Sequence, residues 1–318
     1  MILLAGAGAI GREYALILKD MGQDFSIVCQ SEQTANEVQQ EFNVPSFSGG
    51  LINHLTFNSQ KYQYCIIALP IDILAENCKK VIEHNIPNIL VEKPLSLDLE
   101  VIENIKKAAE MFKTKVYVAY NRRFFTSVSK LQKMAISDGG IRSLNFEFTE
   151  WVDKIDWQNK SKKLIDNWLI ANSSHIIDLA FYLAGEPKKL SAYRVIADKC
   201  ETLPLTPDRY TGAGITHSNV LFSYQANWDG PGRWSVECCS QNYRFLLSPL
   251  EKLQIIKRNK VVSEHVEIDD SYDKKFKPGF YRQVDAFLND KSGLMTLEQQ
   301  HNRFSVYQEM HQPTRERT

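Results

Sequence analysis

The sequence predicts an α/β protein in two domains: a doubly wound parallel sheet over residues 1–120, and an α+β domain with a largely antiparallel open sheet over residues 121–318. Three observations lead to this prediction. Short apolar runs alternate with helical stretches in the first part of the chain, which is the pattern of βαβ units. After about Asn121, apolar and polar residues alternate, as in strands with one covered face. A glycine-rich turn joins the first predicted strand to the first predicted helix.

The opening strand and its glycine turn predict a dinucleotide-binding site. The apolar run Ile2–Ala5 leads into Gly-Ala-Gly-Ala-Ile-Gly, a G-x-G-x-x-G pattern, and then into the helical stretch Arg12–Lys19. In this pattern Gly6 allows a tight turn, Gly8 lets a pyrophosphate approach, and Gly11 lets the helix pack closely on the strand. The helix start directs N–H groups and its positive dipole end at the phosphates. We therefore expect a Rossmann domain; the alternative is a turn that binds nothing.

The other elements of the first domain follow in alternation. The predicted strands are Asp24–Cys29, Tyr64–Leu69, Asn88–Val91 and Val116–Ala119, and the predicted helices are Thr34–Phe42, Ile73–His84 and Asp98–Met111. Ligands of doubly wound sheets bind beyond the carboxyl ends of the strands. The loops that follow these strands are therefore expected to meet at one ligand-binding edge.

The end of the second strand bears on the choice between NAD and NADP. NAD enzymes usually place Asp or Glu there to hold the ribose hydroxyls, whereas this chain has Gln30 followed by Ser31. Ser31 could bond a 2′-phosphate, and Gln30 could equally bond a ribose hydroxyl, so the expected cofactor is NAD or NADP. The residues predicted to contact it are Gly6, Gly8, Ala9, Ile10, Gly11, Gln30, Ser31, Ala68, Leu69, Pro70, Glu92 and Lys93.

The second domain is predicted from its alternating strands. These are Leu144–Trp151, Ser191–Ala197, Ser218–Trp228, Arg233–Cys239, Tyr243–Ser248 and Leu253–Arg258. Helices are expected at Asn172–Ala184, Pro278–Asn289 and Leu297–Met310, all as parts of this domain. The polar tail Gln312–Thr318 is expected to fray.

Composition and charge narrow the class of protein. The 38 basic and 38 acidic residues balance, so no global field favours nucleic acid or an anionic membrane. No apolar run approaches the roughly 20 residues of a membrane-spanning helix, and no signal peptide is recognised. The six cysteines lack C-x-x-C spacing and are expected to be reduced and mostly buried. No cluster has the spacing of a metal site, so we expect a cytoplasmic protein without a bound metal.

Three further motifs indicate which family of dinucleotide-binding proteins the sequence resembles. VEKPLSLD (Val91–Asp98) ends a predicted strand, NSSHIID (Asn172–Asp178) enters a helix, and AYNRRF (Ala119–Phe124) lies at the domain junction. With the opening glycines, the sequence resembles the glucose–fructose oxidoreductase / inositol dehydrogenase / MocA family over nearly its whole length. Trp228–Glu237 and Leu247–Glu251 are similar to members associated with surface-sugar biosynthesis.

The resemblance implies hydride transfer between a nicotinamide and a carbon that carries a hydroxyl or carbonyl group on a sugar or cyclitol. The lysine of the family's E-K-P motif is Lys93, which would sit between nicotinamide and substrate. A lysine at a strand end can donate hydrogen bonds to the reacting oxygen and stabilise a developing alkoxide. His175 is the implied general acid/base. Asp178, three residues later, either orients the imidazole or is structural.

One position departs from the family pattern. Many dehydrogenases of this family carry an acid four residues before this histidine, where the chain has Ala171, followed by Asn172. Loss of that carboxylate disfavours the imidazolium form of the histidine. Three outcomes are open: Lys93 and His175 act as a dyad, another carboxylate takes the place of the acid, or the chain binds its ligands without converting them.

The substrate is expected at the domain junction and beside the Gly-Pro-Gly turn. Arginine forks suit phosphates and carboxylates, and tryptophan faces can stack on sugars, although the tryptophans could instead pack in the sheet. The residues predicted to bind substrate are Tyr120, Asn121, Arg122, Asn172, His175, Trp228 and Arg233. We expect an NAD(P)-dependent oxidoreductase of a sugar or nucleotide-sugar, forming a homodimer or homotetramer through the second sheet. The alternative is a non-catalytic dinucleotide-binding sensor or assembly protein.

Overall fold

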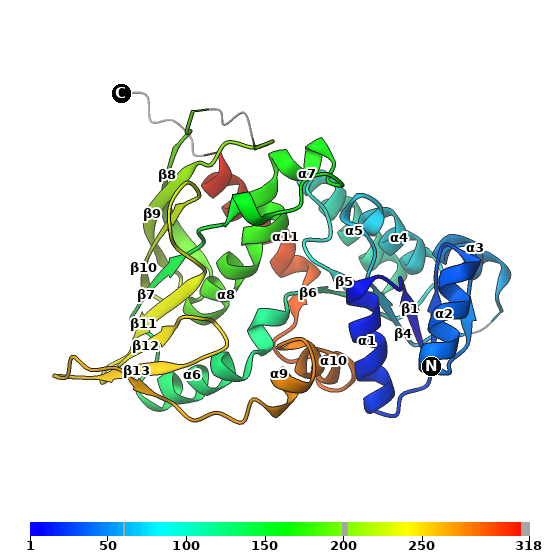
Figure 1. Cartoon of the computed structure of the whole chain (residues 1–318), viewed down its shortest axis with the longest axis horizontal. Helices are drawn as coiled ribbons and strands as arrows, with labels where there is room; N and C mark the ends of the chain where they lie inside the picture. Colours follow the sequence, from blue (N-terminus) through cyan, green and yellow to red (C-terminus); the bar gives the residue numbers. More distant parts are fainter. Residues whose placement is uncertain (60, 199–202, 313–318) are drawn as a thin grey trace. The chain divides into compact units, whose positions relative to one another are not determined.

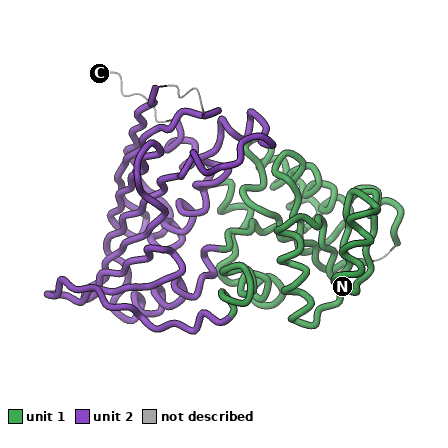
Figure 2. The backbone as a smooth tube through the Cα atoms, viewed as in Figure 1, with its two compact units in different colours: residues 1–121, 272–302 green, residues 122–271, 303–318 purple. Residues whose placement is uncertain are grey.

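The chain divides into two compact units (Figure 2), and the computed structural model describes residues 1–59, 61–198 and 203–312. Unit 1 consists of Met1–Asn121 and Tyr272–Asn302; unit 2 consists of Arg122–Ser271 and the chain from Arg303 onward. The sequence placed all of residues 121–318 in the second domain, whereas residues 272–302 lie in unit 1. Cys200 and residues 313–318 of the tail that was expected to fray lie outside the described residues.

The described part of unit 1 is built on a seven-stranded sheet with the order β15-β6-β5-β4-β1-β2-β3. Its neighbouring strands are parallel except for β15, which pairs antiparallel with β6. Figure 1 labels β1, β4, β5 and β6 of this sheet. Buried apolar runs form the central strands, as expected for a sheet covered on both faces. The strands are β1 Ile2–Ala5, β2 Phe25–Val28, β3 Ser46–Phe47, β4 Tyr64–Ile67, β5 Asn88–Glu92, β6 Lys115–Ala119 and β15 Met295–Thr296.

Some helices of unit 1 begin at side-chain caps. Ser31 accepts a hydrogen bond from the N–H of Thr34, and Asp98 accepts one from Glu100, so each satisfies an N–H group at a helix start. The helices are α1 Ala9–Asp20, α2 Glu32–Phe42, α3 Leu51–Phe57, α4 Ile71–Glu83, α5 Leu99–Phe112, α9 Ser271–Lys275 and α10 Phe280–Leu288. α11, Leu297–His311, runs from unit 1 into unit 2.

α10 returns from late in the chain to pack on α1. The rings of Tyr14 and Phe280 lie 5.1 Å apart, and the Tyr14 hydroxyl lies 3.3 Å from the side chain of Gln283. These contacts join residues more than 260 positions apart, and no local pattern encodes them. This packing is why the helix near Pro278–Asn289 belongs to unit 1 rather than to the second domain.

Unit 2 contains, within its described residues, an eight-stranded sheet with the order β14-β13-β12-β11-β7-β10-β9-β8. Its neighbouring strands are antiparallel except for β7 and β10. The strands are β7 Ser143–Glu147, β8 Pro187–Val195, β9 Arg209–Thr216, β10 Leu221–Asn227, β11 Ser235–Cys239, β12 Tyr243–Leu247, β13 Gln254–Lys257 and β14 Glu264–His265. With the Rossmann-type unit 1, this sheet confirms the predicted fold class.

Helices cover one face of the second sheet. α8, Ser174–Ala184, packs against β7, with the ring of Phe181 edge-on to Phe146 at 5.8 Å and to Phe222 at 5.0 Å. Inward residues of β10 and β11 are buried while their neighbours are exposed or half-buried, which is the predicted alternation. The other helical segments of this part of the chain are η1 Asn121–Phe124, α6 Thr126–Ser137, η2 Val152–Lys154, α7 Lys162–Asp166 and the π-helix η3 Leu169–Ser173.

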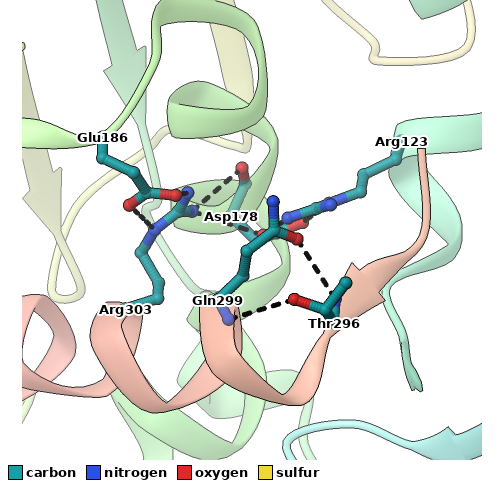
Figure 3. A network of polar contacts seen from close by, with 6 residues as sticks. All are labelled: Arg123, Asp178, Glu186, Thr296, Gln299 and Arg303. Atoms are coloured by element: carbon teal, nitrogen blue, oxygen red, sulfur yellow. Dashed lines mark hydrogen bonds and ion pairs between the residues drawn. The ribbon is translucent and has the colours of Figure 1, made fainter. Parts of the chain in front are cut away.

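A buried ion network anchors α8 (Figure 3). Both Asp178 oxygens accept from Arg123, at 2.7 Å from Nε and 2.6 Å from Nη2, and Oδ1 lies 3.3 Å from Nη1 of Arg303. Arg303 also pairs with Glu186. Asp178 is 1% exposed and Arg123 3% exposed, and such pairs cost several kcal/mol to break from one side. Of the two roles considered for Asp178, the network favours the structural one.

A capping box starts α11. The N–H of Gln299 donates to the Thr296 hydroxyl at 3.2 Å, and the N–H of Thr296 donates to the Gln299 side chain at 3.1 Å (Figure 3). This reciprocal pair satisfies two N–H groups at the helix start. Among the described residues, no helix has both the length and the apolar character needed to cross a membrane.

Candidate functional site

The predicted ligand-binding edge of unit 1 is set by strand register. Ala5 pairs with Ile67, and Ile67 pairs with Val91, so β1 and β4 end at the same level and β5 ends one residue later. The glycine turn follows Ala5 directly, and Lys93 follows the last residue of β5. Because parallel strands present their carboxyl ends at one edge, these segments of unit 1 converge there.

The three glycines of the turn differ in what surrounds them. Gly6 has φ +103°, and a Cβ there would lie 2.3 Å from the Ala68 carbonyl oxygen. A Cβ on Gly11 would lie 2.1 Å from the Gly6 oxygen, so the helix could not pack this closely on the turn. At Gly8 a Cβ would meet nothing within 4 Å. Gly6 and Gly11 are therefore needed for the backbone path, whereas Gly8 borders open space, as a backbone that receives a pyrophosphate must.

A pocket with a volume of about 840 Å³ lies beside this turn in unit 1. Of the predicted cofactor residues, seven line it: Gly6, Gly8, Gln30, Ser31, Ala68, Leu69 and Pro70. Ala9, Ile10 and Gly11 form the first turn of α1, where N–H groups lack helical partners. The sequence missed part of the lining, namely Ala7, Val28, Cys29, Thr34, Gly49, Gly50, Leu51, Ile52, Asn53, Ile73, Glu76 and Asn77.

The missed loop before α3 carries a sequence signal of its own. Gly49 and Gly50 are adjacent and both have positive φ, +88° and +84°, which favours glycine. Their N–H groups donate to the carbonyls of Gln30 and Cys29, at 3.1 and 2.8 Å. A Cβ on Gly50 would lie 2.8 Å from Oε1 of Gln30. The glycine pair thus lets this loop close against the end of β2.

The end of β2 is polar and uncharged. Ser31 uses its hydroxyl within α2, accepting from the Thr34 N–H at 3.2 Å and bonding the Thr34 hydroxyl at 2.9 Å. None of the residues that line the pocket is Lys, Arg or His. The nearby Arg12 lies beside Glu37 and Glu41, with which it forms ion pairs. The cationic partner that a 2′-phosphate usually takes is therefore not among the lining residues.

Glu92 faces α1 rather than the pocket. Its carboxylate accepts from the Tyr14 hydroxyl at 2.8 Å, and burial raises the pKa of the Glu92 carboxyl above its usual range. Burial, together with the Glu92 charge, raises the pKa of Tyr14. Glu92 thus ties the end of β5 to α1, and it is not one of the lining residues.

The Lys93 turn is held by its neighbours. Pro94 follows Lys93 through a cis peptide bond, the N–H of Leu95 donates to the Glu92 oxygen at 3.1 Å, and Gln300 donates to the Pro94 oxygen at 2.9 Å. Lys93 is half-buried directly after β5. The turn therefore places Lys93 at the carboxyl edge of the sheet of unit 1, although not among the pocket-lining residues.

Two predicted substrate residues are buried in unit 1. Tyr120 is 1% and Asn121 is 4% exposed, and the amide of Asn121 donates to the Pro278 oxygen at 2.9 Å. This bond ties the end of β6 to the chain entering α10. Their burial favours a structural role over contact with substrate.

In unit 2, an aromatic and cationic cluster surrounds His175. The ring centroids of His175 and Trp234 lie 6.1 Å apart, and the guanidinium of Arg122 lies 4.6 Å from the Trp234 centroid. Arg233 lies 4.7 Å from the ring of Trp151 and 5.4 Å from that of Trp234. Three of the predicted residues, Arg122, His175 and Arg233, therefore come together around Trp234, stabilised by cation–π contacts.

Trp228 lies apart from this cluster. It is 5% exposed, its indole N–H donates to the Phe148 oxygen at 3.2 Å, and its ring lies 5.1 Å from that of Tyr210. Trp228 therefore packs in the sheet, and the prediction that it binds substrate has no support in the structure.

A carboxylate lies next to the predicted Asn172. Glu150, which follows β7, is 2% exposed, and both its oxygens accept from Nδ2 of Asn172 at 3.0 Å. Its Oε1 also accepts from the Ser173 hydroxyl at 2.6 Å. Ala171 is buried in the same π-helical segment. The sequence did not predict Glu150, because it lies 22 positions before Asn172.

The family model described as "Oxidoreductase family, NAD-binding Rossmann fold", which is the glucose–fructose oxidoreductase / inositol dehydrogenase / MocA family, matches residues 1–120. The chain is similar to this oxidoreductase family over those residues. The resemblance stated from the sequence motifs is thereby confirmed for residues 1–120. A search of curated proteins found no match to the chain.

Solved structures share the fold across both units. An oxidoreductase from Agrobacterium radiobacter, in complex with NAD+, L-tartaric acid and magnesium, is 13% identical with a TM-score of 0.79, covering 99% of this chain and 96% of its own. UDP-N-acetylglucosamine 3-dehydrogenase GnnA from Acidithiobacillus ferrooxidans is 16% identical, with a TM-score of 0.75 and coverage of 98% and 96%. A super-repressor mutant of Gal80p from Saccharomyces cerevisiae is 12% identical, with a TM-score of 0.79 and coverage of 98% and 94%.

The unit 1 pocket fits NAD. The open space at Gly8, the start of α1, and the apolar wall of Ala68, Leu69 and Pro70 are the features that a dinucleotide requires. The described residues contain no group of three or more His, Cys, Asp or Glu side chains arranged to hold a metal ion. The cysteines that the structure describes are free, and all but Cys239 are buried.

Proposed function

We propose that this protein is an NAD(P)-dependent oxidoreductase that transfers a hydride between the nicotinamide and a hydroxyl or carbonyl carbon of a sugar or nucleotide-sugar. The observation that carries the proposal is the unit 1 pocket, with open space at Gly8 and with Lys93 at the same edge of the sheet. When bound, the dinucleotide supplies the hydride acceptor or donor. The fold likeness to UDP-N-acetylglucosamine 3-dehydrogenase supports the class of substrate.

Lys93 is proposed to hold and polarise the reacting oxygen. An ammonium group offers three donors and a positive charge that stabilises a developing alkoxide. Its turn is fixed by the Leu95–Glu92 and Gln300–Pro94 hydrogen bonds of unit 1. A fixed turn supports this role, because a catalytic donor must be held in place before the substrate reacts.

His175 is proposed to exchange the hydroxyl proton. An imidazole takes up and returns protons near neutral pH. The contact with Trp234 and the position of Asp178 within the ion network hold its helix in place. Arg122 and Arg233, beside the same tryptophan, are proposed to bind an anionic group of the substrate.

NAD is proposed as the preferred cofactor over NADP. The pocket lining contains Glu76 but no basic residue, and Ser31 is engaged in capping α2. The ion pairs of Arg12 with Glu37 and Glu41 neutralise the nearby guanidinium. A 2′-phosphate would therefore be desolvated without a cationic partner, which disfavours it.

The exposed face of the unit 2 sheet is proposed to join copies of the chain into a homodimer or homotetramer. Tyr193 on β8 and Leu221 on β10 are 59% and 61% exposed. Exposed apolar side chains on a sheet face are typical of association surfaces. Light scattering on the purified protein measures the oligomeric state, and a monomer at micromolar concentration would contradict this proposal.

Substitution of Lys93 tests the catalytic proposal. The wild type and Lys93→Ala are assayed for nicotinamide absorbance change with a panel of sugars and nucleotide-sugars. We expect the substitution to lower kcat by about 10²- to 10⁴-fold, the usual contribution of a proton-transfer group or charge stabiliser, while NADH binding stays unchanged. Lys107→Ala serves as the matched control, because Lys107 is 67% exposed on α5. Activity that survives Lys93→Ala would refute the role of Lys93.

The alternative function is a non-catalytic dinucleotide-binding sensor or assembly protein. Ala171, in place of the acid that many family dehydrogenases carry, supports it, as does the fold likeness to a super-repressor mutant. NADH binding without turnover of any compound in the panel would favour this alternative.

A further inference from the structure

Glu150 is a buried carboxylate that the proposed reaction does not yet use. It lies three residues after the end of β7 and is 2% exposed. Burying a carboxylate costs free energy unless several hydrogen bonds compensate. Within unit 2, both oxygens of Glu150 accept from Nδ2 of Asn172 at 3.0 Å, and its Oε1 accepts from the Ser173 hydroxyl at 2.6 Å.

These donors belong to the turn that leads into His175. Asn172 and Ser173 end the π-helix η3, and His175 is the second residue of α8. Ser174 between them is helical, with φ −52° and ψ −26°. Asn172 and Ser173 lie three and two residues before His175, so the carboxylate that holds their side chains holds the backbone from which His175 projects. π-Helical turns are themselves frequent at functional sites.

A second anchor holds the same helix from the other side of His175. Asp178 lies one turn later and is fixed by Arg123 and Arg303. The backbone is thus held by a buried carboxylate on each side of His175 in the sequence. Glu150 holds the turn before the histidine, and Asp178 lies in α8 after it.

We infer that Glu150 is the positioning residue for His175: through Asn172 and Ser173, its carboxylate fixes the direction in which the imidazole meets the substrate. This inference rests on the proposed function, in which His175 exchanges the proton. It identifies the carboxylate that takes the place of the acid missing at Ala171, although it comes from a different element. Glu150 acts on the imidazole through the π-helical turn.

Kinetics of Glu150→Gln test the inference. The amide keeps the size of the side chain but removes the charge and places a donor against the Nδ2 of Asn172. We expect kcat to fall about 10- to 100-fold, as for a small misplacement of a catalytic group, while KM changes less than about 3-fold. Glu147→Gln is the matched control, because Glu147 ends the same strand and accepts from the Thr149 hydroxyl at 2.6 Å. Unchanged kcat in Glu150→Gln, or an equal loss in Glu147→Gln, would overturn the inference.

Exchanging the carboxylate and the amide between Glu150 and Asn172 distinguishes a positioning role of Glu150 from a simple loss of packing. Asn172→Asp alone sets two carboxylates against each other and is expected to lower both the melting temperature and kcat. The double variant Glu150→Gln/Asn172→Asp restores one carboxylate and one amide across the contact with reversed polarity. We expect it to recover most of kcat, a coupling that a double-mutant cycle measures. A folded double variant with kcat no better than the product of the single effects would count against the inference.

A spectroscopic readout keeps this test independent of turnover. The side-chain ¹⁵N–¹H signals of His175 are assigned by comparison with His175→Gln in histidine-labelled protein. We expect Glu150→Gln to shift the His175 imidazole signals and to leave those of His54, in unit 1, unchanged. If the wild type binds NADH but converts nothing, the proposed function fails while this spectrum still decides the role of Glu150. Unshifted His175 signals would refute it.

Discussion

Replacement of Gly8 by alanine should remove dinucleotide binding without unfolding the domain. A Cβ at Gly8 meets no atom within 4 Å, and its backbone, with φ −69° and ψ −173°, is one that any residue adopts. The weaker capping by alanine and the reduced chain entropy of the unfolded state oppose each other, so we expect stability to change by less than about 1 kcal/mol. The added methyl group projects into the space that a pyrophosphate would occupy. Affinity for NADH should fall at least about tenfold, or about 1.4 kcal/mol.

Gly11→Ala is the contrasting variant, because it should destabilise the fold, whereas Gly8→Ala should affect only dinucleotide binding. Its Cβ would lie 2.1 Å from the Gly6 carbonyl oxygen, a backbone atom that cannot rotate away. We expect it to destabilise the fold by about 3 kcal/mol, toward the upper end of overpacking costs. NADH fluorescence titration measures the affinity, and urea unfolding measures the free energy of unfolding. Wild-type affinity in a folded Gly8→Ala variant would show that the pyrophosphate does not bind at this turn.

Three further predictions concern the ion network, acid stability and the cofactor. Asp178→Ala leaves buried Arg123 without its bidentate partner, so it should lower the free energy of unfolding by about 3–5 kcal/mol; a loss below about 1 kcal/mol in urea would contradict the network's role. Burial, reinforced by nearby positive charge, lowers the pKa of His311 from 6.5 to about 4. Between pH 6.5 and 4 the unfolded chain therefore binds a proton that the folded chain does not. The free energy of unfolding should decrease by up to about 3 kcal/mol over this range. If it fell as steeply with pH in His311→Gln as in the wild type, His311 would not be the cause. NADPH should bind at least about tenfold more weakly than NADH because the phosphate lacks a cation, and Ser31→Arg should narrow the gap; equal wild-type affinities for the two would refute this reading of the pocket.

Patterns in short stretches of sequence predicted those strands and turns that a single contiguous segment forms. The turn Gly6–Gly11 and the strands β1, β4 and β5 were predicted, the last two with bounds that differ by one or two residues, because each is coded by a contiguous run. Parallel pairing then places their carboxyl ends at one edge. The position of Lys93 at this edge was predicted for the same reason, because Lys93 directly follows a strand of the parallel sheet.

Contacts between segments that are distant in the sequence could not be predicted from these local patterns. α10 carries a helical pattern in either unit, and only its packing through Phe280 on Tyr14 assigns it to unit 1. β15 is two residues long and is a strand because β6 offers it an antiparallel edge. Short segments of this kind take their structure from the surface on which they pack.

The sequence by itself determined the dinucleotide turn and the similarity of residues 1–120 to the oxidoreductase family, because glycines at fixed spacing leave few alternative backbones. Only the tertiary structure decided which polar side chains serve the predicted chemistry. Trp228 and Trp234 look alike in sequence, yet one packs on Tyr210 in the sheet and the other lies beside His175. Glu150 became visible only once folding placed it against Asn172. Burial and hydrogen-bond partners come from elements far apart in the chain, and they separate a positioning side chain from one that merely packs.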